Sequence, residues 1–268
     1  MDDQQKQPPS IVCWVHKCNK SVIQLTLGDN DEKKQQQQCR LCDRHHQEPL
    51  DFVVKLDYPL VRANQTSFEL LIKPMSGRFL TEFGNGSQLH IGIANGAQSP
   101  DQCRVLEYDH RGIRLSDGSQ WDQCLPLGLA ELFNIRAKRR QKVFIEVWYL
   151  FVDGFQSDNG SNNDNNGRSQ WTAANYDPIH HNCFDFAIDF VRKIGEKLHN
   201  SHPSHENDGN IEGNELKSTA RYLLQSCDSK EKFCQTFVMS RMKQLARYLA
   251  LYKKTNVGFI GNKHHNSL

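Results

Sequence analysis

A cysteine stands where the sequence predicts the start of a helix. In the stretch HHNCFDFA, at residues 180–187, Asn182 and Asp185 have the residue types and the spacing of a helix capping pair. Cys183 would then lie in the first turn, where unpaired N–H groups and the helix dipole favour a thiolate over a thiol. Because a thiolate is a nucleophile, this position is typical of covalent catalysis, which also needs a base.

His90 is the candidate base. Residues 89–93, LHIGI, alternate with the period of a strand, so His90 faces away from its apolar neighbours and Gly92 leaves space beside it. If that face meets the helix start, the imidazole can take the thiol proton and later protonate a leaving group. His110, at the end of the next expected strand, is the candidate for orienting the imidazole. The alternative is that Cys183 and His90 are ordinary buried residues.

Four cysteines in the first 50 residues indicate a second kind of site. Cys39 and Cys42 form a C-x-x-C pair, the spacing that lets two thiolates share one zinc ion. Cys18, with either His16 or Cys13, can complete a zinc-ribbon-like ligand set. We take His16, Cys18, Cys39 and Cys42 as the expected ligands of a structural zinc and expect no other cofactor. The alternative is a reduced, metal-free segment.

The sequence predicts that strands come first along the chain and helices later, and these elements must position the candidate residues. Short apolar stretches bounded by turns predict strands at residues 68–72, 88–94 and 103–108. Residues 143–155 fit either a strand or a helix, and we favour a helix. Apolar stripes predict a helix from Asn182 onward and one or two more over residues 216–254. This order predicts an α+β domain.

Length and composition limit the class of protein. The chain has 268 residues, 37% of them hydrophobic, and 33 Lys and Arg against 31 Asp and Glu. A net charge of +2 gives no overall field toward nucleic acid or anionic lipid, so any site for a polyanion must be local, and nucleic acid is not an expected partner. The longest nearly continuous apolar run, residues 143–152 with Glu146 inside it, is far shorter than the roughly 20 residues needed to cross a bilayer, so no membrane span is expected.

Polar stretches divide the chain into expected parts. Residues 1–10, 28–38, 157–170 and 199–215 have compositions that predict loops or disorder. The expected organisation is a Cys-rich, zinc-ribbon-like module over residues 1–50, an α+β domain over 51–256 with insertions near 157–170 and 199–215, and a polar tail over 257–268.

The first residues of the chain and one basic run indicate the cellular compartment. The acidic, polar first ten residues lack the features of a secretory signal, so we expect a cytoplasmic protein with reduced thiols. The basic run RAKRRQK at residues 136–142 is typical either of a nuclear import signal or, more often, of a solvated surface. The cytoplasm, with the nucleus as an additional site, is therefore the expected location.

Several stretches together resemble the makorin opposite-strand protein family. They are F-x-L-x-I-x-P-x-x-G-x-F-L-x-E-F at residues 68–83, LHIGI at 89–93, residues 171–176, and His181-Asn182-Cys183 followed by Ala187. A His-x-Gly strand that precedes an Asn-Cys helix start is also similar to the circularly permuted papain-like group, which includes lecithin retinol acyltransferase and NlpC-type thiol hydrolases. His90 precedes Cys183, as the histidine does in the permuted members.

This resemblance implies a permuted papain-like fold, in which an antiparallel sheet packs on helices. It implies Cys183 as the nucleophile, His90 as the base and His110 as the orienting group. The implied reaction is hydrolysis or acyl transfer through an acyl-enzyme, on an acyl or peptide substrate that the sequence does not identify. The Cys183 backbone N–H would stabilise the oxyanion. The alternative is a catalytically inactive papain-like protein that binds protein partners.

Overall fold

The computed structural model describes residues 10–15, 21–26, 52–84, 86–95, 103–132, 138–156, 170–200 and 211–262. The chain divides into two compact units, one formed by Met1–Pro59 with Lys243–Leu268 and the other by Leu60–Met242. The boundary expected at residue 50 therefore precedes the division at Pro59, and the last helix is shared between the units. The polar stretches at residues 28–38 and 157–169 lie outside the described residues.

The first unit contains a three-stranded antiparallel sheet in the order β2-β1-β3. Its strands are β1 (Ser10–Val15), β2 (Ser21–Thr26) and β3 (Phe52–Leu56). The helix α6 (Met239–Asn262) contributes its later residues to this unit, and the rings of Tyr58 and Tyr248 meet edge to face at 5.5 Å between their centroids. The polar tail expected from residue 257 is helical as far as Asn262, which extends the helix beyond the predicted end.

The second unit is built on a five-stranded antiparallel sheet in the order β7-β6-β5-β4-β8. Its strands are β4 (Glu69–Pro74), β5 (Leu89–Ala94), β6 (Arg104–Asp109), β7 (Gly112–Asp117) and β8 (Leu125–Pro126). The three strands predicted from the sequence are confirmed, with ends that differ by one or two residues. The sequence prediction missed β7 and β8: in β7 the alternation of apolar and polar residues is a strand signal but covers few residues, and β8 is only two residues long.

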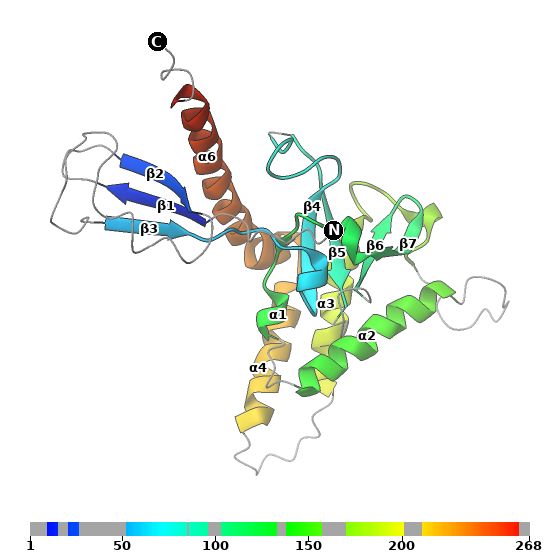
Figure 1. The fold of residues 1–268 in the computed structure, drawn as a ribbon. Coiled ribbons are helices and arrows are strands. Elements are labelled where there is room, and N and C mark those ends of the chain that lie inside the picture. The colour runs from blue at the N-terminus through cyan, green and yellow to red at the C-terminus, as the bar shows by residue number, and fades with distance from the viewer. Residues whose placement is uncertain are drawn as a thin grey trace, which may run out of the picture. The chain divides into compact units, whose positions relative to one another are not determined.

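Helices complete the second unit and confirm the α+β class (Figure 1). They are α1 (Leu129–Leu132), α2 (Lys138–Gln156), α3 (Cys183–Asn200), α4 (Ile211–Ser226) and α5 (Lys230–Phe233), with a π-helical turn at Cys234–Val238 before α6. Residues 143–155 lie within α2, so the helix prediction is confirmed. The stretch at 199–215 is not all loop, because α3 runs to Asn200 and α4 begins at Ile211.

The helix α3 is central to the second unit. It packs on α2, on α4 and on the strands β5 and β6. Phe186 and Phe190 on its buried face each contact Phe151 of α2 edge to face, with ring centroids 5.3 Å apart. Fully burying such a side chain stabilises a fold by roughly 1.5–3 kcal/mol. This packing holds the first turn of α3, with Cys183, against the sheet.

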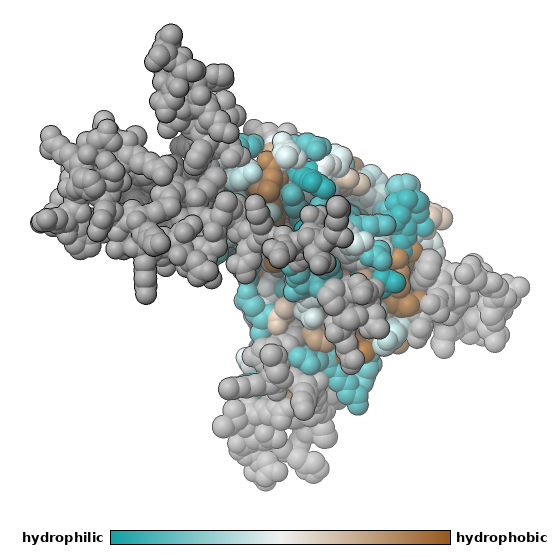
Figure 2. Space-filling model, viewed as in Figure 1, coloured by the Kyte–Doolittle hydropathy of each residue, from teal (hydrophilic) through white to brown (hydrophobic). Residues whose placement is uncertain are grey.

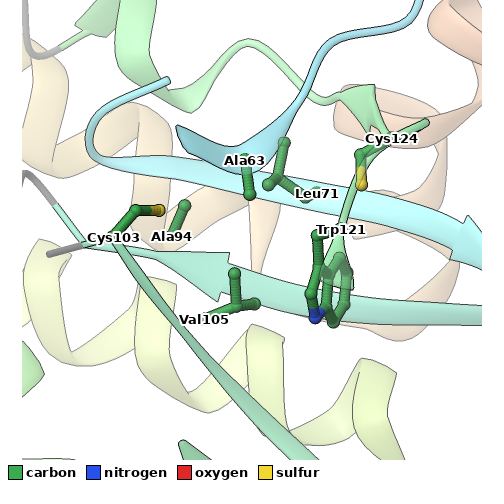
Figure 3. Packing of buried hydrophobic residues seen from close by; sticks show 7 residues of the cluster. All are labelled: Ala63, Leu71, Ala94, Cys103, Val105, Trp121 and Cys124. Carbon is green, nitrogen blue, oxygen red and sulfur yellow. The ribbon is translucent and has the colours of Figure 1, made fainter. Parts of the chain in front are cut away.

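A second cluster covers the sheet face that carries His90. Leu71, Ala94 and Val105, from three neighbouring strands, project from that face and pack against Trp121, as Figure 3 shows. A Cβ atom on Gly92 would lie 2.5 Å from Cη2 of Trp121 and 2.6 Å from Cγ1 of Val105. The glycine in the LHIGI motif is therefore the position where the indole rests on the strand.

The described surface carries scattered apolar side chains. On the face in Figure 2, hydrophobic residues are separated by hydrophilic ones. Exposed large apolar residues include Met75, Ile145, Tyr149, Leu150 and Ile179. Within the described ranges, no helix is both long enough and apolar enough to cross a membrane.

The close approach of Trp121 to Gly92 predicts a strong effect of a small substitution. We expect Gly92→Ala to lower the free energy of unfolding by about 1–3 kcal/mol, since the added methyl group overpacks a filled space. Chemical denaturation of the full chain measures this. The matched control is Gly84→Ala, because a Cβ atom there meets nothing within 4 Å. Equal stability of the two variants would contradict the packing described here.

Candidate functional site

Cys183 is the first residue of α3, and a reciprocal pair of hydrogen bonds fixes the helix start. The side-chain oxygen of Asn182 accepts a hydrogen bond of 2.9 Å from the Phe184 backbone N–H. In return, the Asp185 carboxylate accepts a hydrogen bond of 3.0 Å from the Asn182 backbone N–H. The predicted capping pair is therefore confirmed. The N–H of Cys183 has no carbonyl of an earlier turn to bond, which leaves it available to a ligand.

The segment before Cys183 is held on both sides. Asp177 and His181 exchange two backbone hydrogen bonds of 3.0 Å, which close a tight turn. The His181 ring stacks on Trp171 with centroids 4.3 Å apart, and its Nδ1 lies 3.1 Å from the Tyr108 hydroxyl. From the other side, the Lys230 ammonium donates to the Asp185 carboxylate at 2.8 Å. These contacts fix the backbone that presents the thiol.

His90 lies on β5, buried, and joins two partners. Its Nε2 is 2.8 Å from a carboxylate oxygen of Glu107, and its side chain is also hydrogen-bonded to Cys183. With Nε2 engaged by Glu107, Nδ1 is the ring nitrogen left for the thiol. The structure thus brings together the cysteine and the histidine that the sequence singled out.

Glu107 completes this row of side chains. It stands opposite Gly92 in the β5–β6 register and opposite Arg114 in the β6–β7 register, so all three positions share the His90 face. The buried carboxylate accepts hydrogen bonds from the Ser116 hydroxyl and from the Arg114 guanidinium as well as from His90. A carboxylate held in this way fixes the orientation of the imidazole.

The electrostatics of the pair favour a charged imidazolium. Burial alone would lower the pKa of His90, but hydrogen bonds to Cys183 and Glu107, together with their charges, raise it to about 9. Burial alone would raise the pKa of Glu107, but hydrogen bonds from His90, Ser116 and Arg114 bring it down to about 2. At neutral pH the site therefore holds an imidazolium against a carboxylate.

His110 lies outside this row. It is exposed on the turn after β6, and its ring contacts Tyr176 at 6.5 Å between centroids. The carboxylate on the imidazole comes instead from Glu107, which the sequence reasoning missed. A signal was present, because Glu107 interrupts the apolar residues Val105, Leu106 and Tyr108 in the strand next to β5. The catalytic role of each residue stays a prediction at this point.

The predicted metal ligands are not placed. Cys13 lies in β1, while His16, Cys18, Cys39 and Cys42 lie outside the described residues. Zinc binding by this set stays a prediction. Across the described ranges, no group of three or more His, Cys, Asp or Glu side chains is arranged to hold a metal ion.

Comparison with known proteins places the site within a family. The model of the family described as DUF4796 C-terminal matches residues 53–255. The chain belongs to this family. The MKRN2 opposite strand protein of Homo sapiens is 22% identical over 217 residues, which make up 80% of this chain and 76% of that protein. The resemblance to the makorin opposite-strand proteins is thereby confirmed. No solved structure matches the chain.

The family match covers one candidate site and leaves out the other. Cys183, His90 and Glu107 all lie within residues 53–255. The cysteines expected to bind zinc, from Cys13 to Cys42, precede the matched range. The thiol site is therefore the one that belongs to the shared region of the family.

The pKa of His90 gives a direct test of the hydrogen-bonded row. We expect NMR titration of the His90 ring to give a pKa near 9 in the wild type. In Glu107→Gln the pKa should fall below that of the wild type, since burial then lowers it with only the contact to Cys183 left to oppose it. Asp117→Asn, which removes an exposed carboxylate from the same sheet, should leave the pKa unchanged. An unchanged value in Glu107→Gln would show that the carboxylate does not act on the ring.

The same shift predicts how stability depends on pH. The pKa of His90 is raised above its value in the unfolded chain, so the contribution of the imidazolium is complete below about pH 6.5. It is lost as the pH rises toward 9. The difference in unfolding free energy between the wild type and Glu107→Gln should therefore narrow over that range, as measured by urea denaturation at each pH. A difference that widens would contradict the assignment.

Proposed function

We propose that this protein is a thiol hydrolase or acyltransferase with Cys183 as nucleophile, His90 as acid and base, and Glu107 as the group that orients the imidazole. The observation that carries the proposal is the row of three side chains, in which His90 is hydrogen-bonded to both Cys183 and Glu107. Nucleophile, base and orienting group in hydrogen-bonded sequence are typical of covalent catalysis.

The order of elements supports a permuted papain-like fold as part of this proposal. The histidine lies on a strand of an antiparallel sheet, and the cysteine follows later in the chain at the start of a helix that packs on the sheet. This is the arrangement expected from the resemblance to the permuted group. The free thiols at the described cysteine positions agree with a reducing compartment, and we propose the cytoplasm.

The first half of the reaction forms an acyl-enzyme. The Cys183 sulfur, with its proton held by the His90 imidazolium, attacks as a thiolate on the carbonyl carbon of an ester, thioester or amide, and the carbonyl electron pair moves onto oxygen. The Cys183 N–H donates to that oxyanion. The tetrahedral intermediate then collapses, and the leaving group departs with the proton that His90 holds. The raised pKa of His90 suits this step, because the ring carries a proton at neutral pH.

The second half releases the acyl group. His90, now neutral, takes a proton from a water molecule, whose oxygen attacks the thioester carbonyl carbon. Cys183 leaves as a thiolate, and the imidazolium is restored. In acyl transfer an alcohol or amine takes the place of water, and the same proton movements apply. Glu107 remains a carboxylate throughout and stabilises each imidazolium that forms.

A second function has one observation in its favour. Cys183 is only 5% exposed, which fits a catalytically inactive protein of the same fold whose surface binds a protein partner. A buried thiol without a route for substrate would not turn over. Reaction of Cys183 with an added acyl donor therefore separates the two functions.

The acyl-enzyme supplies that test. We expect p-nitrophenyl acetate to give a burst of p-nitrophenol and to place one acetyl group on the peptide that contains Cys183, because the thiol attacks before water does. Stopped-flow absorbance and peptide mass spectrometry measure these two results. Cys183→Ala should lose the burst and keep the circular dichroism spectrum of the wild type.

The matched control is Cys234→Ala. Cys234 is a partly buried free cysteine in the turn before α6, and its replacement should leave the burst intact. A burst that survives in Cys183→Ala, or acetyl groups spread over lysines with none on Cys183, would contradict the proposed mechanism and favour the binding protein.

A further inference from the structure

Lys73 lies beside the thiol site on the neighbouring strand. It stands directly opposite His90 in the β4–β5 register. Opposite residues of an antiparallel pair project to the same face, with Cβ atoms about 4.5–5.5 Å apart. Lys73 therefore shares the sheet face of His90 and Glu107, and its side chain begins next to the imidazole.

The indole of Trp121 fixes where the ammonium lies. Lys73 Nζ is 3.9 Å from the Trp121 ring centroid, the geometry of a cation–π contact. Trp121 is buried, and its ring lies 5.8 Å from the His90 ring between centroids. Because Trp121 is itself clamped over Gly92, the cation is held on a rigid platform adjoining the catalytic histidine.

Lys73 lacks the carboxylate partner that its charged neighbours have. Arg114 pairs with Glu107, Arg111 pairs with Asp109, and Arg78 pairs with Asp122. Among the residues that the structure describes, no carboxylate oxygen lies within 4.0 Å of Lys73 Nζ. Removing a cation partly from water without an ion-pair partner costs free energy. Burial accordingly lowers the pKa of Lys73, against the opposing charge of Glu107.

We propose that Lys73 and Trp121 form a subsite for an anionic group of the substrate, a carboxylate or a phosphate, next to His90. The anion supplies a counter-charge in direct contact with the ammonium and accepts its hydrogen bonds. The preferred acyl donors are then those with a negative charge close to the scissile carbonyl. This inference rests on the proposed thiol chemistry at Cys183 and names the class of substrate for it.

A pair of alkylating reagents tests the subsite without a known substrate. Iodoacetate and iodoacetamide react with a thiol in the same way, since sulfur displaces iodide in both, but only iodoacetate carries a negative charge. The rate of each reaction at Cys183 is measured by peptide mass spectrometry on the full chain. The variants are Lys73→Met, which removes the charge, and Lys73→Arg, which keeps it. Lys193→Met, on the outer surface of α3, changes the net charge equally at an exposed position.

We expect Lys73→Met to slow the iodoacetate reaction about threefold to tenfold, the effect of one charge at short range in a partly buried site. The rate at which Lys73→Met reacts with iodoacetamide should equal the wild-type rate within experimental error. An equal rate would also show that the site in the variant is folded. Lys73→Arg should keep most of the iodoacetate rate, and Lys193→Met should keep both rates. Added salt should lower the iodoacetate rate relative to the iodoacetamide rate only in proteins that carry a positive charge at residue 73.

Two results would overturn the inference, and they differ from a failure of the proposed function. If Lys73→Met leaves the iodoacetate rate unchanged, or slows both reagents equally, the anionic subsite is wrong while the nucleophile stands. If Cys183 of the wild type reacts with neither reagent until the protein unfolds, the proposed function itself fails, and the subsite with it.

Discussion

The buried hydrogen bond between His90 and Glu107 is the interaction on which the rest of the site depends. It joins two charged groups inside the sheet, where an unpaired charge would be strongly unfavourable. Ser116 and Arg114 complete the carboxylate's hydrogen bonds, so the pair is fully satisfied on that side. The imidazole is also hydrogen-bonded to Cys183. Removing Glu107 would therefore alter the charge, the orientation and the partner of His90 together.

Both the sheet and the helices of the fold hold this group of side chains in place. From the sheet, Gly92 allows Trp121 to lie on β5 and to shield the His90 face from water, while Leu71 and Val105 fill the space around it. From the helices, the aromatic packing of α3 and its capping pair set the position of the thiol. Strands β4 to β7 follow one another along the chain, whereas α3 begins at Cys183, far beyond the end of β7 at Asp117. The site therefore forms only when both the sheet and α3 have folded.

The sequence was informative where local physical rules decide the outcome. The capping pair fixed the start of α3, and strand alternation separated His90 from the apolar face of β5, so the two reactive residues could be named. Glu107 could not be assigned to His90, because a partner on another strand depends on the register, which no local pattern in the chain specifies. Lys73 and Trp121 could not be assigned to the site either, because their positions beside His90 also depend on contacts between different strands and loops. His110 is the expected orienting group because it ends the next predicted strand, yet it lies exposed on the turn after β6.

The most direct measurement is the rate at which Cys183 reacts with iodoacetamide at pH 6, compared within one protein with the rate at Cys234 and between wild type and His90→Ala. Cys183 is the more buried of the two thiols, so exposure alone would make it the slower. The account predicts that Cys183 nevertheless reacts first, and that His90→Ala removes the advantage. Labelling of Cys183 that lags behind Cys234, or that does not depend on His90, would contradict it.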